Sequence, residues 1–323
     1  MKGILRRLAR LTIPAIDFLM AIPLFLAAIV MKLFRRIGAA RMPICKSILM
    51  HVGVFPIREH YYEPLFNPKH LQYPLDKDRL LPGVDLNAEG QLELLNQLDF
   101  SDELIGRWIE PGNPPIFSIS NGSFEAGDAE YWYSIIRHFK PRRIIEIGSG
   151  CSTLIAIHAI KKNREIDPTF ACEHICVEPY EAPWLEDVGV RVVRKRVEDL
   201  DLSFFAKLDK NDILFIDSSH IIRPQGDVLT EFLTILPTLK VGVIVHVHDI
   251  FTPKDYSSEA IIGEVSFWNE QYLLEAFLTH NNKWEIIGAL NYLQHHHYEQ
   301  LKRIAPYLER HREPGSFYFT RIL

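Results

Sequence analysis

Short apolar runs rich in β-branched and aromatic residues recur through the C-terminal two thirds of the chain, and longer amphipathic stretches separate them. The short runs predict strands at residues 143–147, 172–178, 190–194, 212–217, 243–247, 284–290 and 316–320. The amphipathic stretches predict helices over residues 87–98, 128–140, 267–280 and 298–310, with Asp128 as a candidate N-cap. Strands that alternate with helices form a mostly parallel sheet covered on both faces, so the predicted fold class is α/β.

Residues 1–45 differ sharply from the rest, because residues 11–34 are mostly apolar and residues 18–31 carry no charge. This uncharged core is shorter than the roughly 20 residues that cross a bilayer, and Asp17 and Pro23 also count against a span. Basic residues flank the segment: Lys2, Arg6, Arg7 and Arg10 precede it, and Lys32, Arg35, Arg36 and Arg41 follow it. The pattern predicts a hydrophobic helical arm that associates with an anionic membrane surface. A true span and a buried core helix stay open as alternatives.

Residues 46–110 connect this arm to the predicted α/β domain, residues 111–323. The clearest break in the chain is at residues 111–115, where prolines and a glycine cluster. Within the connection, residues 55–64 combine arginine, histidine, tyrosine and glutamate beside prolines. Such a loop suits two roles, closing over a ligand as a lid or docking the arm to the domain.

The first predicted strand ends in a glycine turn at residues 148–150, and a helix is expected to start at Ser152 or Thr153. Glycines let the backbone turn sharply and approach a ligand closely, and a helix N-terminus adds unpaired N–H groups. Dinucleotide-binding folds use G-x-G-x-x-G at the same place. Here Ser152 stands where their next glycine is expected, and Glu146 lies inside the strand.

Polar side chains follow the next four predicted strands at the same edge of the sheet. They are Glu178 after the second strand, Glu198 or its runner-up Asp199 after the third, Asp217 after the fourth and His248-Asp249 after the fifth. Ligands of open α/β sheets bind where the carboxyl ends of the strands meet. The sequence therefore predicts a binding site at this edge.

Taken in this order, the glycine turn and the strand-end carboxylates resemble the class I S-adenosylmethionine-dependent methyltransferases over about residues 111–323. The resemblance implies a Rossmann-like sheet of seven strands, the last one antiparallel. It implies that Glu146 serves the amino-acid end of the cofactor, Glu178 its ribose and Glu198 its adenine. The cofactor residues that it implies are Glu146, Gly148, Ser149, Gly150, Ser152, Glu178, Glu198 and Asp217. Phe124, Asp128 and Tyr131 are secondary candidates, because the segment before the first strand often covers the cofactor in this family.

The candidate catalytic residues are Asp217, His220, His248 and Asp249, which follow the fourth and fifth strands. Histidine is the usual base near neutral pH. The arrangement also resembles the metal-dependent O-methyltransferases, including those acting on catechols and on macrolide sugars. This resemblance implies a divalent ion held by Asp217, His248 and Asp249. The histidine departs from the oxygen ligands that Mg²⁺ prefers, so a histidine base without metal stays open. His246 lies deeper on the fifth strand and is expected to pack in the core.

Composition narrows the classes of partner. The formal net charge of −5 supplies no basic field for nucleic acid. Four cysteines are too few for a disulfide scaffold in a chain of 323 residues. Cys172, His174 and Cys176 alternate along one strand, but no second pair of ligands lies nearby in sequence, which favours a buried reduced face over a zinc site.

The resemblance implies S-adenosylmethionine-dependent methyl transfer. We expect the acceptor to be a hydroxyl of a glycan, of a lipid-linked saccharide or of a small metabolite. Because this cofactor is made in the cytosol, we expect a membrane-associated protein with a cytosolic catalytic domain. Two alternatives remain open, a non-catalytic membrane-tethered scaffold and an NAD-dependent Rossmann oxidoreductase. The Tyr-x-x-x-Lys pair expected of the oxidoreductase is not evident near the strand ends.

Overall fold

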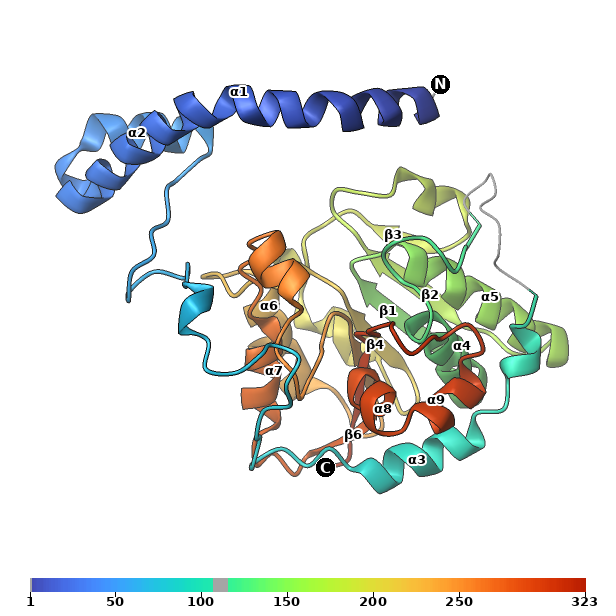
Figure 1. Ribbon diagram of the computed structural model, residues 1–323. Helices are drawn as coiled ribbons and strands as arrows, with labels where there is room; N and C mark the ends of the chain where they lie inside the picture. Colours follow the sequence, from blue (N-terminus) through green and yellow to red (C-terminus); the bar gives the residue numbers. More distant parts are fainter. Residues whose placement is uncertain (1, 107–115) are drawn as a thin grey trace. The chain divides into compact units, whose positions relative to one another are not determined.

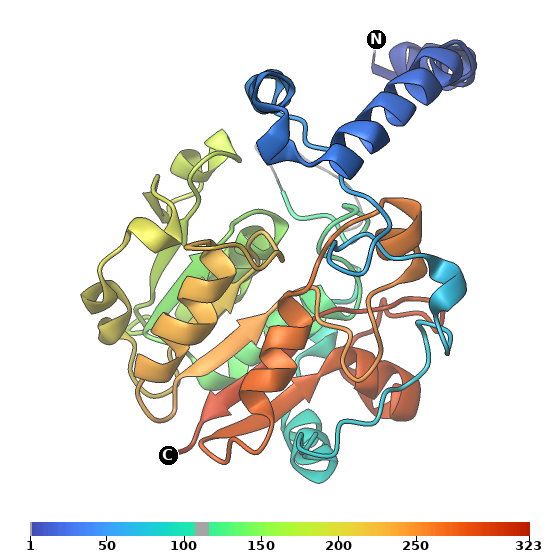
Figure 2. The same cartoon turned by 90° about the vertical axis from the view of Figure 1, so that its left-hand side faces the viewer.

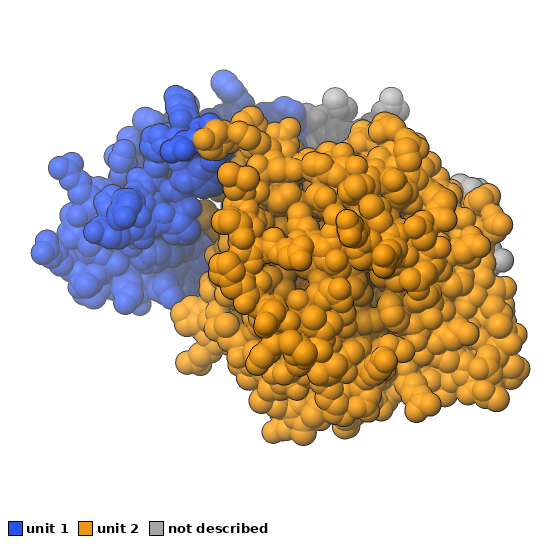
Figure 3. Space-filling view, turned by 90° about the horizontal axis from the view of Figure 1, so that it is seen from below, with its two compact units in different colours: residues 1–72 blue, residues 73–323 orange. Residues whose placement is uncertain are grey.

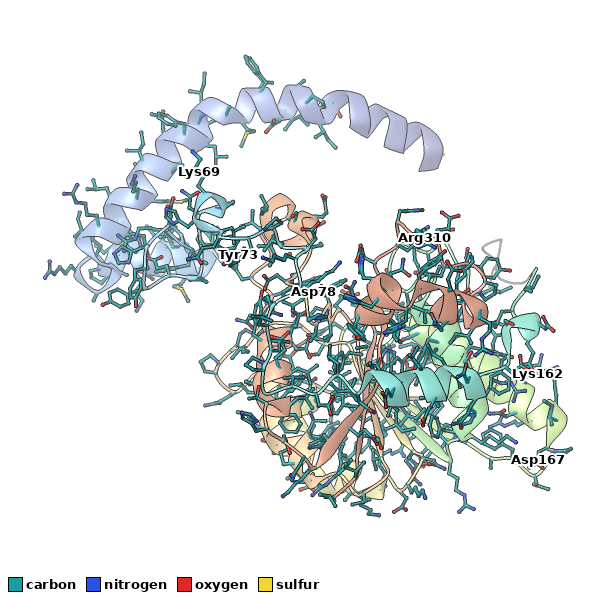
Figure 4. The ribbon with its side chains drawn as sticks, turned by 60° about the horizontal axis from the view of Figure 1, so that its bottom comes forward. Lys69, Tyr73, Asp78, Lys162, Asp167 and Arg310 are labelled. Atoms are coloured by element: carbon teal, nitrogen blue, oxygen red, sulfur yellow. The ribbon has the colours of Figure 1, made fainter. Side chains whose placement is uncertain are left out.

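The computed structural model of the protein describes residues 2–106 and 116–323, with side chains described from Thr12 onward. The predicted break at residues 111–115, the domain boundary placed there and the side chains of Lys2, Arg6, Arg7 and Arg10 lie outside this description. The chain divides into two compact units, residues 1–72 and 73–323, coloured separately in Figure 3. Lys69 and Tyr73, labelled in Figure 4, lie on either side of this division in sequence.

Unit 1 contains two helices, α1 (Lys2–Ile37) and α2 (Pro43–Val52), among its described residues. Helix α1 includes Pro14 and Pro23 and is far longer than the uncharged core recognised in the sequence. Its segment Thr12–Ile37 is long and apolar enough to cross a membrane, with a mean hydropathy of 2.3. Its side chains stand out from the ribbon along the helix in Figure 4.

Unit 2 is built on one seven-stranded sheet, formed by described residues between 143 and 321. Its strands are β1 (Arg143–Ile147), β2 (Glu173–Val177), β3 (Arg191–Val193), β4 (Ile213–Ile216), β5 (Ile244–Val247), β6 (Trp284–Ala289) and β7 (Phe317–Arg321). They are ordered β3-β2-β1-β4-β5-β7-β6. The first five pair in parallel, and β7 is antiparallel to both β5 and β6. The predicted Rossmann-like sheet is therefore confirmed.

Helices cover both faces of this sheet, as Figures 1 and 2 show. They are α3 (Ala88–Gln97), α4 (Asp128–Phe139), α5 (Cys151–Ile166), α6 (Asp227–Thr230), α7 (Glu270–Leu278), α8 (Leu290–His296) and α9 (Tyr298–Ile304). Alternate residues of the central strands contribute to two apolar cores. One core joins Ile144 and Phe215 to α3, α4, α5, α8 and α9, and the other joins Ile145 and Leu214 to α7 and the segment after α6. Apolar burial on both faces is what makes the β-branched strand runs continuous.

One predicted helix cap and one predicted helix end were wrong, and in each case a nearby contact or residue explains why. Gly127 is the N-cap of α4, and Asp128 is the first residue of the helix. The Asp128 carboxylate instead accepts hydrogen bonds from the backbone N–H groups of Gly315 and Ser316, at 3.3 and 2.7 Å. The helix predicted over residues 298–310 ends at Ile304, because Pro306 lacks an N–H group and disfavours helical geometry in the residue before it.

Residues 73–106 belong structurally to the α/β unit, although the sequence placed them in the connection. The Gln91 side chain of α3 accepts a hydrogen bond from the N–H of Ala289 at the end of β6. Arg79 donates to the Glu275 carboxylate on α7 at 2.8 Å. These bonds fix the segment to the sheet and its helices at two points.

Candidate active site

The turn after β1 requires glycine because the backbone just after β4 lies directly against it. Gly148 has a φ of +78°, and a Cβ atom there would overlap the backbone carbonyl oxygen of Asp217. The Gly148 N–H donates to the carbonyl of Val177 at the end of β2. Three strand ends are therefore brought together at this turn. Helix α5 begins at Cys151, one or two residues earlier than the start predicted at Ser152 or Thr153.

Glu146 supports the turn from beneath. It is fully buried, and the Thr153 hydroxyl donates to its carboxylate while accepting from the N–H of Gly150. His174 Nε2 lies 3.2 Å from its Oε1, and Cys176 Sγ lies 3.8 Å from its Oε2. The structure thus adds Glu146 to the His174–Cys176 face recognised in the sequence. Glu146 does not border the nearby cavity, and a direct role toward the cofactor stays a prediction.

A cavity of about 690 Å³ opens at the carboxyl edge of the sheet. Of the predicted cofactor residues, Gly148, Glu178, Glu198 and Asp217 line it, and Ser149, Gly150 and Ser152 do not. The Glu178 carboxylate is oriented by the N–H groups of Tyr180 and Glu181, both at 2.9 Å. Glu198 borders the cavity, whereas its runner-up Asp199 does not and is paired with Arg196 at 2.8 Å. The volume is in the range of small-molecule and cofactor sites.

His248 is buried among carboxylates beside this cavity. Its Nδ1 lies 3.7 Å from carboxylate oxygens of both Asp217 and Asp249, and its Nε2 lies 3.7 Å from Asp128. Neither ring nitrogen has a hydrogen-bond partner among the described residues. The Phe124 ring packs 4.9 Å from the imidazole. Two secondary candidates from the sequence, Asp128 and Phe124, thus contact His248.

His220 lies on the other side of the same carboxylates. Its Nε2 is 3.5 Å from both Asp217 and Asp249, and its Nδ1 is hydrogen-bonded to Glu270 at 2.9 Å. The residue has a left-handed φ of 58°, and its carbonyl accepts from the N–H groups of Asn269 and Glu270. The beginning of α7 therefore holds both the backbone and the ring of His220.

The charges in this cluster shift the pKa values of its members. Burial lowers the pKa of His220, but the hydrogen bond and charge of Glu270 outweigh it and raise the pKa to about 9. Burial also lowers the pKa of His248, but the charges of Asp249 and Asp217 outweigh burial. The pKa of His248 is therefore raised well above its ordinary value. Burial raises the pKa of Asp249, whereas the His248 charge overcomes burial and lowers that of Asp217. Perturbed groups of this kind at a cavity are typical of functional sites.

A second cavity of about 150 Å³ adjoins the cluster at His248 and Asp249. It is lined by Gly122, Ser123, Glu125, Ala126, Asp128, His248, Asp249 and residues 312–315. Arg312 pairs with Glu125 at its wall. The lining is mainly polar, which suits a ligand that carries hydroxyl groups.

The remaining candidates lie elsewhere. His246 is fully buried, with its Nε2 2.9 Å from the Ser316 hydroxyl and its ring stacked on Tyr318. Tyr131 is also buried and donates to the carbonyl of Ile287. Arg58 belongs to unit 1, where it pairs with Glu63.

The sequence analysis missed Glu270. Its contact with His220 joins residues 50 positions apart, and no motif connects them. The only sign of Glu270 in the sequence was an acidic residue near the start of the helix predicted over 267–280. Acidic residues are common there because they stabilise the helix dipole, so this position does not indicate a role in the site.

Comparison with known proteins identifies a family for this arrangement. A family model described as a methyltransferase domain matches residues 145–250, which run from β1 to the residue after Asp249. An uncharacterized protein of Archaeoglobus fulgidus is 33% identical over 204 residues, which are 56% of this chain and 84% of the relative.

Two solved structures match part of the chain, each with a low TM-score. One is the O-methyltransferase from Bacillus cereus in complex with SAH, with 12% identity and a TM-score of 0.37 over 72% of this chain and 91% of that one. The other is the MycE methyltransferase from the mycinamycin biosynthetic pathway, in complex with Mg, SAH and mycinamycin VI. It has 15% identity and a TM-score of 0.33 over 69% of this chain. The match spans only 54% of the MycE chain.

Proposed function

Because the chain belongs to the class I S-adenosylmethionine-dependent methyltransferases, we propose that it transfers the methyl group of this cofactor to a hydroxyl of a glycan, a lipid-linked saccharide or a small metabolite. The observation that carries the proposal is that one cluster joins two cavities. Asp217 borders the larger cavity, and His248 and Asp249 border the smaller one. Membership of this family also sets aside the NAD-dependent oxidoreductase as an alternative.

The larger cavity is the proposed cofactor site. Glu178 accepts hydrogen bonds from the ribose hydroxyls, because its carboxylate is already oriented at the end of β2. Glu198 faces the adenine from the segment after β3. Gly148 lets the backbone approach the cofactor, and Glu146 acts through Thr153 by holding the turn in place.

The cluster also fits a divalent ion. The ligand atoms of Asp217, His248 and Asp249 all lie within 4.8 Å of one another. His248 supports this assignment because burial without a hydrogen-bond partner is costly for a polar nitrogen. One imidazole and two carboxylates suit Mn²⁺, Fe²⁺ or Zn²⁺ better than Mg²⁺. When bound, such an ion lowers the pKa of an acceptor hydroxyl next to it.

The protein's own residues then have two tasks, alignment and removal of one proton. When bound, the cofactor supplies a methyl carbon whose bond to sulfur breaks as its bond to the acceptor oxygen forms, and a neutral thioether leaves. His220 receives the proton of the hydroxyl in its neutral form, which its raised pKa makes the minor form near neutral pH, and Glu270 fixes the orientation of its ring. The polar wall of the smaller cavity holds the acceptor beside Asp249, whose carboxylate lies 3.5 Å from Nε2 of His220.

Helix α1 supports a place for this reaction at a membrane. The segment Thr12–Ile37 is long and apolar enough to cross a membrane, and Arg35 and Arg36 lie in the last turn of the helix. Basic residues beside an apolar segment favour an anionic cytosolic leaflet. In this proposal residues 1–45 tether the catalytic unit to the cytosolic side, where its cofactor is made, and a lipid-linked acceptor is within reach.

Calorimetry of the full-length protein in detergent tests the cofactor site. S-adenosylmethionine and its demethylated product should bind, and NAD should not. Glu178→Ala should abolish binding, while Glu165→Ala, which removes an exposed carboxylate on α5, should leave it unchanged. Equal binding by both variants would contradict the ribose role.

The acceptor is tested by transfer of a tritiated methyl group into a lysate from a strain that lacks the protein. Label in a glycan, lipid or small-metabolite fraction supports the proposal, and label confined to protein refutes it. Retained cofactor binding without transfer into any fraction would favour the non-catalytic scaffold.

A further inference from the structure

Helix α2 presents an apolar face to its surroundings. Ile44, Ile48 and Val52 are spaced four residues apart, so they lie on one face, and their exposed fractions are 75, 58 and 67%. Lys46 lies on the opposite side of the helix, and Ser47 and His51 border the stripe on the side of Ile44. A stripe of large aliphatic side chains that points outward is typical of a surface that meets another apolar phase.

Charged and aromatic side chains form a cluster at the end of α1, shortly before α2 begins. Arg35 and Arg58 both pair with the Glu63 carboxylate, at 2.9 and 2.8 Å. The Phe55 ring packs edge-on against Phe34. The Arg35 guanidinium lies over the Phe55 ring, 5.0 Å from the ring centre. Paired charges of this kind belong at the polar boundary of a membrane, because burying them in hydrocarbon is costly. This cluster therefore marks where the apolar segment of α1 leaves the bilayer core.

The chain changes direction immediately after this boundary. Gly38 has a φ of +105°, a backbone conformation that residues other than glycine rarely adopt. Helix α2 then starts at Pro43. The ten residues of α2 are too few to cross a bilayer. Its apolar stripe can therefore contact lipid only if the helix lies along the surface.

Two further features of unit 1 suit such a surface. Arg36, Arg41 and Lys46 surround the start of α2 with positive charge that complements anionic headgroups. Tyr61 and Tyr62 are among the most exposed large side chains, and their amphipathic rings are typical of membrane–water interfaces.

We infer that α2 is a second lipid-contacting element, which lies along an anionic bilayer surface with Ile44, Ile48 and Val52 among the acyl chains. The inference rests on the proposed membrane association of α1, and it extends lipid contact beyond residues 1–45. A helix that lies in the interface would restrict the freedom of the tether and keep the following unit close to the membrane surface.

Single labels on the full-length protein test this in vesicles of phosphatidylcholine and phosphatidylglycerol. Cys45→Ser and Cys151→Ala remove the two cysteines that are not buried. A fluorophore is then placed on Ile48→Cys, or on Ser47→Cys as the matched control, which lies about 100° further around the helix. A nitroxide near the lipid headgroup should quench the Ile48 label at least about twofold more than the Ser47 label. A nitroxide at the bilayer centre should quench the Ile48 label less than the shallow one does.

Equal quenching of the two labels, or none, would overturn the inference. A third label on Leu24→Cys, in α1, reports on the tether by itself. If Leu24 is quenched and Ile48 is not, only the inference on α2 fails; if Leu24 is not quenched, the membrane role of α1 fails. Vesicles of phosphatidylcholine alone should weaken the Ile48 signal, and an unchanged signal would overturn the anionic part of the inference.

Discussion

Nδ1 of His220 is hydrogen-bonded to Oε2 of Glu270 at 2.9 Å, and this bond joins the loop after β4 to the first turn of α7. Glu270 is fully buried, so the bond is shielded from water. It directs the other ring nitrogen of His220 toward Asp217 and Asp249. Glu270 is thus a positioning residue for the proposed base.

We therefore expect Glu270→Gln to lower kcat by roughly 10- to 100-fold, because the ring loses its anionic partner. KM and the calorimetric affinity for the cofactor should change little, since Glu270 does not border the larger cavity. The matched control is Glu264→Gln, which removes an exposed carboxylate six residues earlier. A loss of cofactor affinity equal to the loss of kcat would point to a general structural role instead.

The second prediction concerns Gly148. Gly148→Ala introduces a Cβ that overlaps the Asp217 carbonyl and forces a side chain into a left-handed conformation. Together these effects should lower the free energy of unfolding by about 2–5 kcal/mol and weaken cofactor binding. Gly189→Ala is the control, because its φ of +81° is similar but its Cβ meets open space. Thermal unfolding should show a clearly smaller loss for the control; equal losses would mean that the approach of β4 does not matter.

Local patterns predicted the sheet and its polar edge because both depend on short-range rules. A β-branched run followed by glycine specifies a strand and a turn wherever it occurs, and parallel strands necessarily end at one edge. This is why the sequence alone assigns Glu178, Glu198 and Asp217 to one edge, and the structure places all three around one cavity.

Contacts that join distant segments could not be predicted in the same way. Asp128 has the residue type and place of an N-cap, yet its carboxylate bonds to Gly315 and Ser316, far along the chain. Glu270 reaches His220 only because α7 packs beside the end of β4. Such tertiary contacts override local preference, and neither hydrophobic period nor residue spacing records them.

The third prediction uses the buried carboxyl of Glu130, which accepts hydrogen bonds from the N–H groups of Gly127 and Tyr307. Burial raises its pKa to about 7 from the ordinary value of 4.5. The folded protein therefore holds a proton that the unfolded chain releases, and this contribution to stability is lost as pH rises from about 4.5 to about 7. The loss amounts to roughly 3 kcal/mol.

Denaturant unfolding of the wild type and of Glu130→Gln at several pH values measures this effect. The variant has one acceptor oxygen in place of two, so it loses one of the two hydrogen bonds from backbone N–H groups and should be less stable at every pH. Its stability should nevertheless fall less between pH 5 and 7. The difference in slope is the readout, because all other groups titrate alike in both proteins. Parallel slopes would contradict the raised pKa.

The last prediction concerns the proposed ion at Asp217, His248 and Asp249. Chelation with EDTA should abolish turnover and leave cofactor affinity nearly unchanged, because of these three residues only Asp217 borders the larger cavity. Added Mn²⁺ should restore the rate. His248→Ala should reproduce the effect of EDTA without rescue, whereas His311→Ala, at an exposed position, should behave as the wild type. Full turnover in EDTA, combined with a large loss in His220→Ala, would assign the chemistry to a histidine base without metal. Near-normal turnover in both His220→Ala and His248→Ala would contradict this account of the site, because each variant removes a side chain that contacts both Asp217 and Asp249.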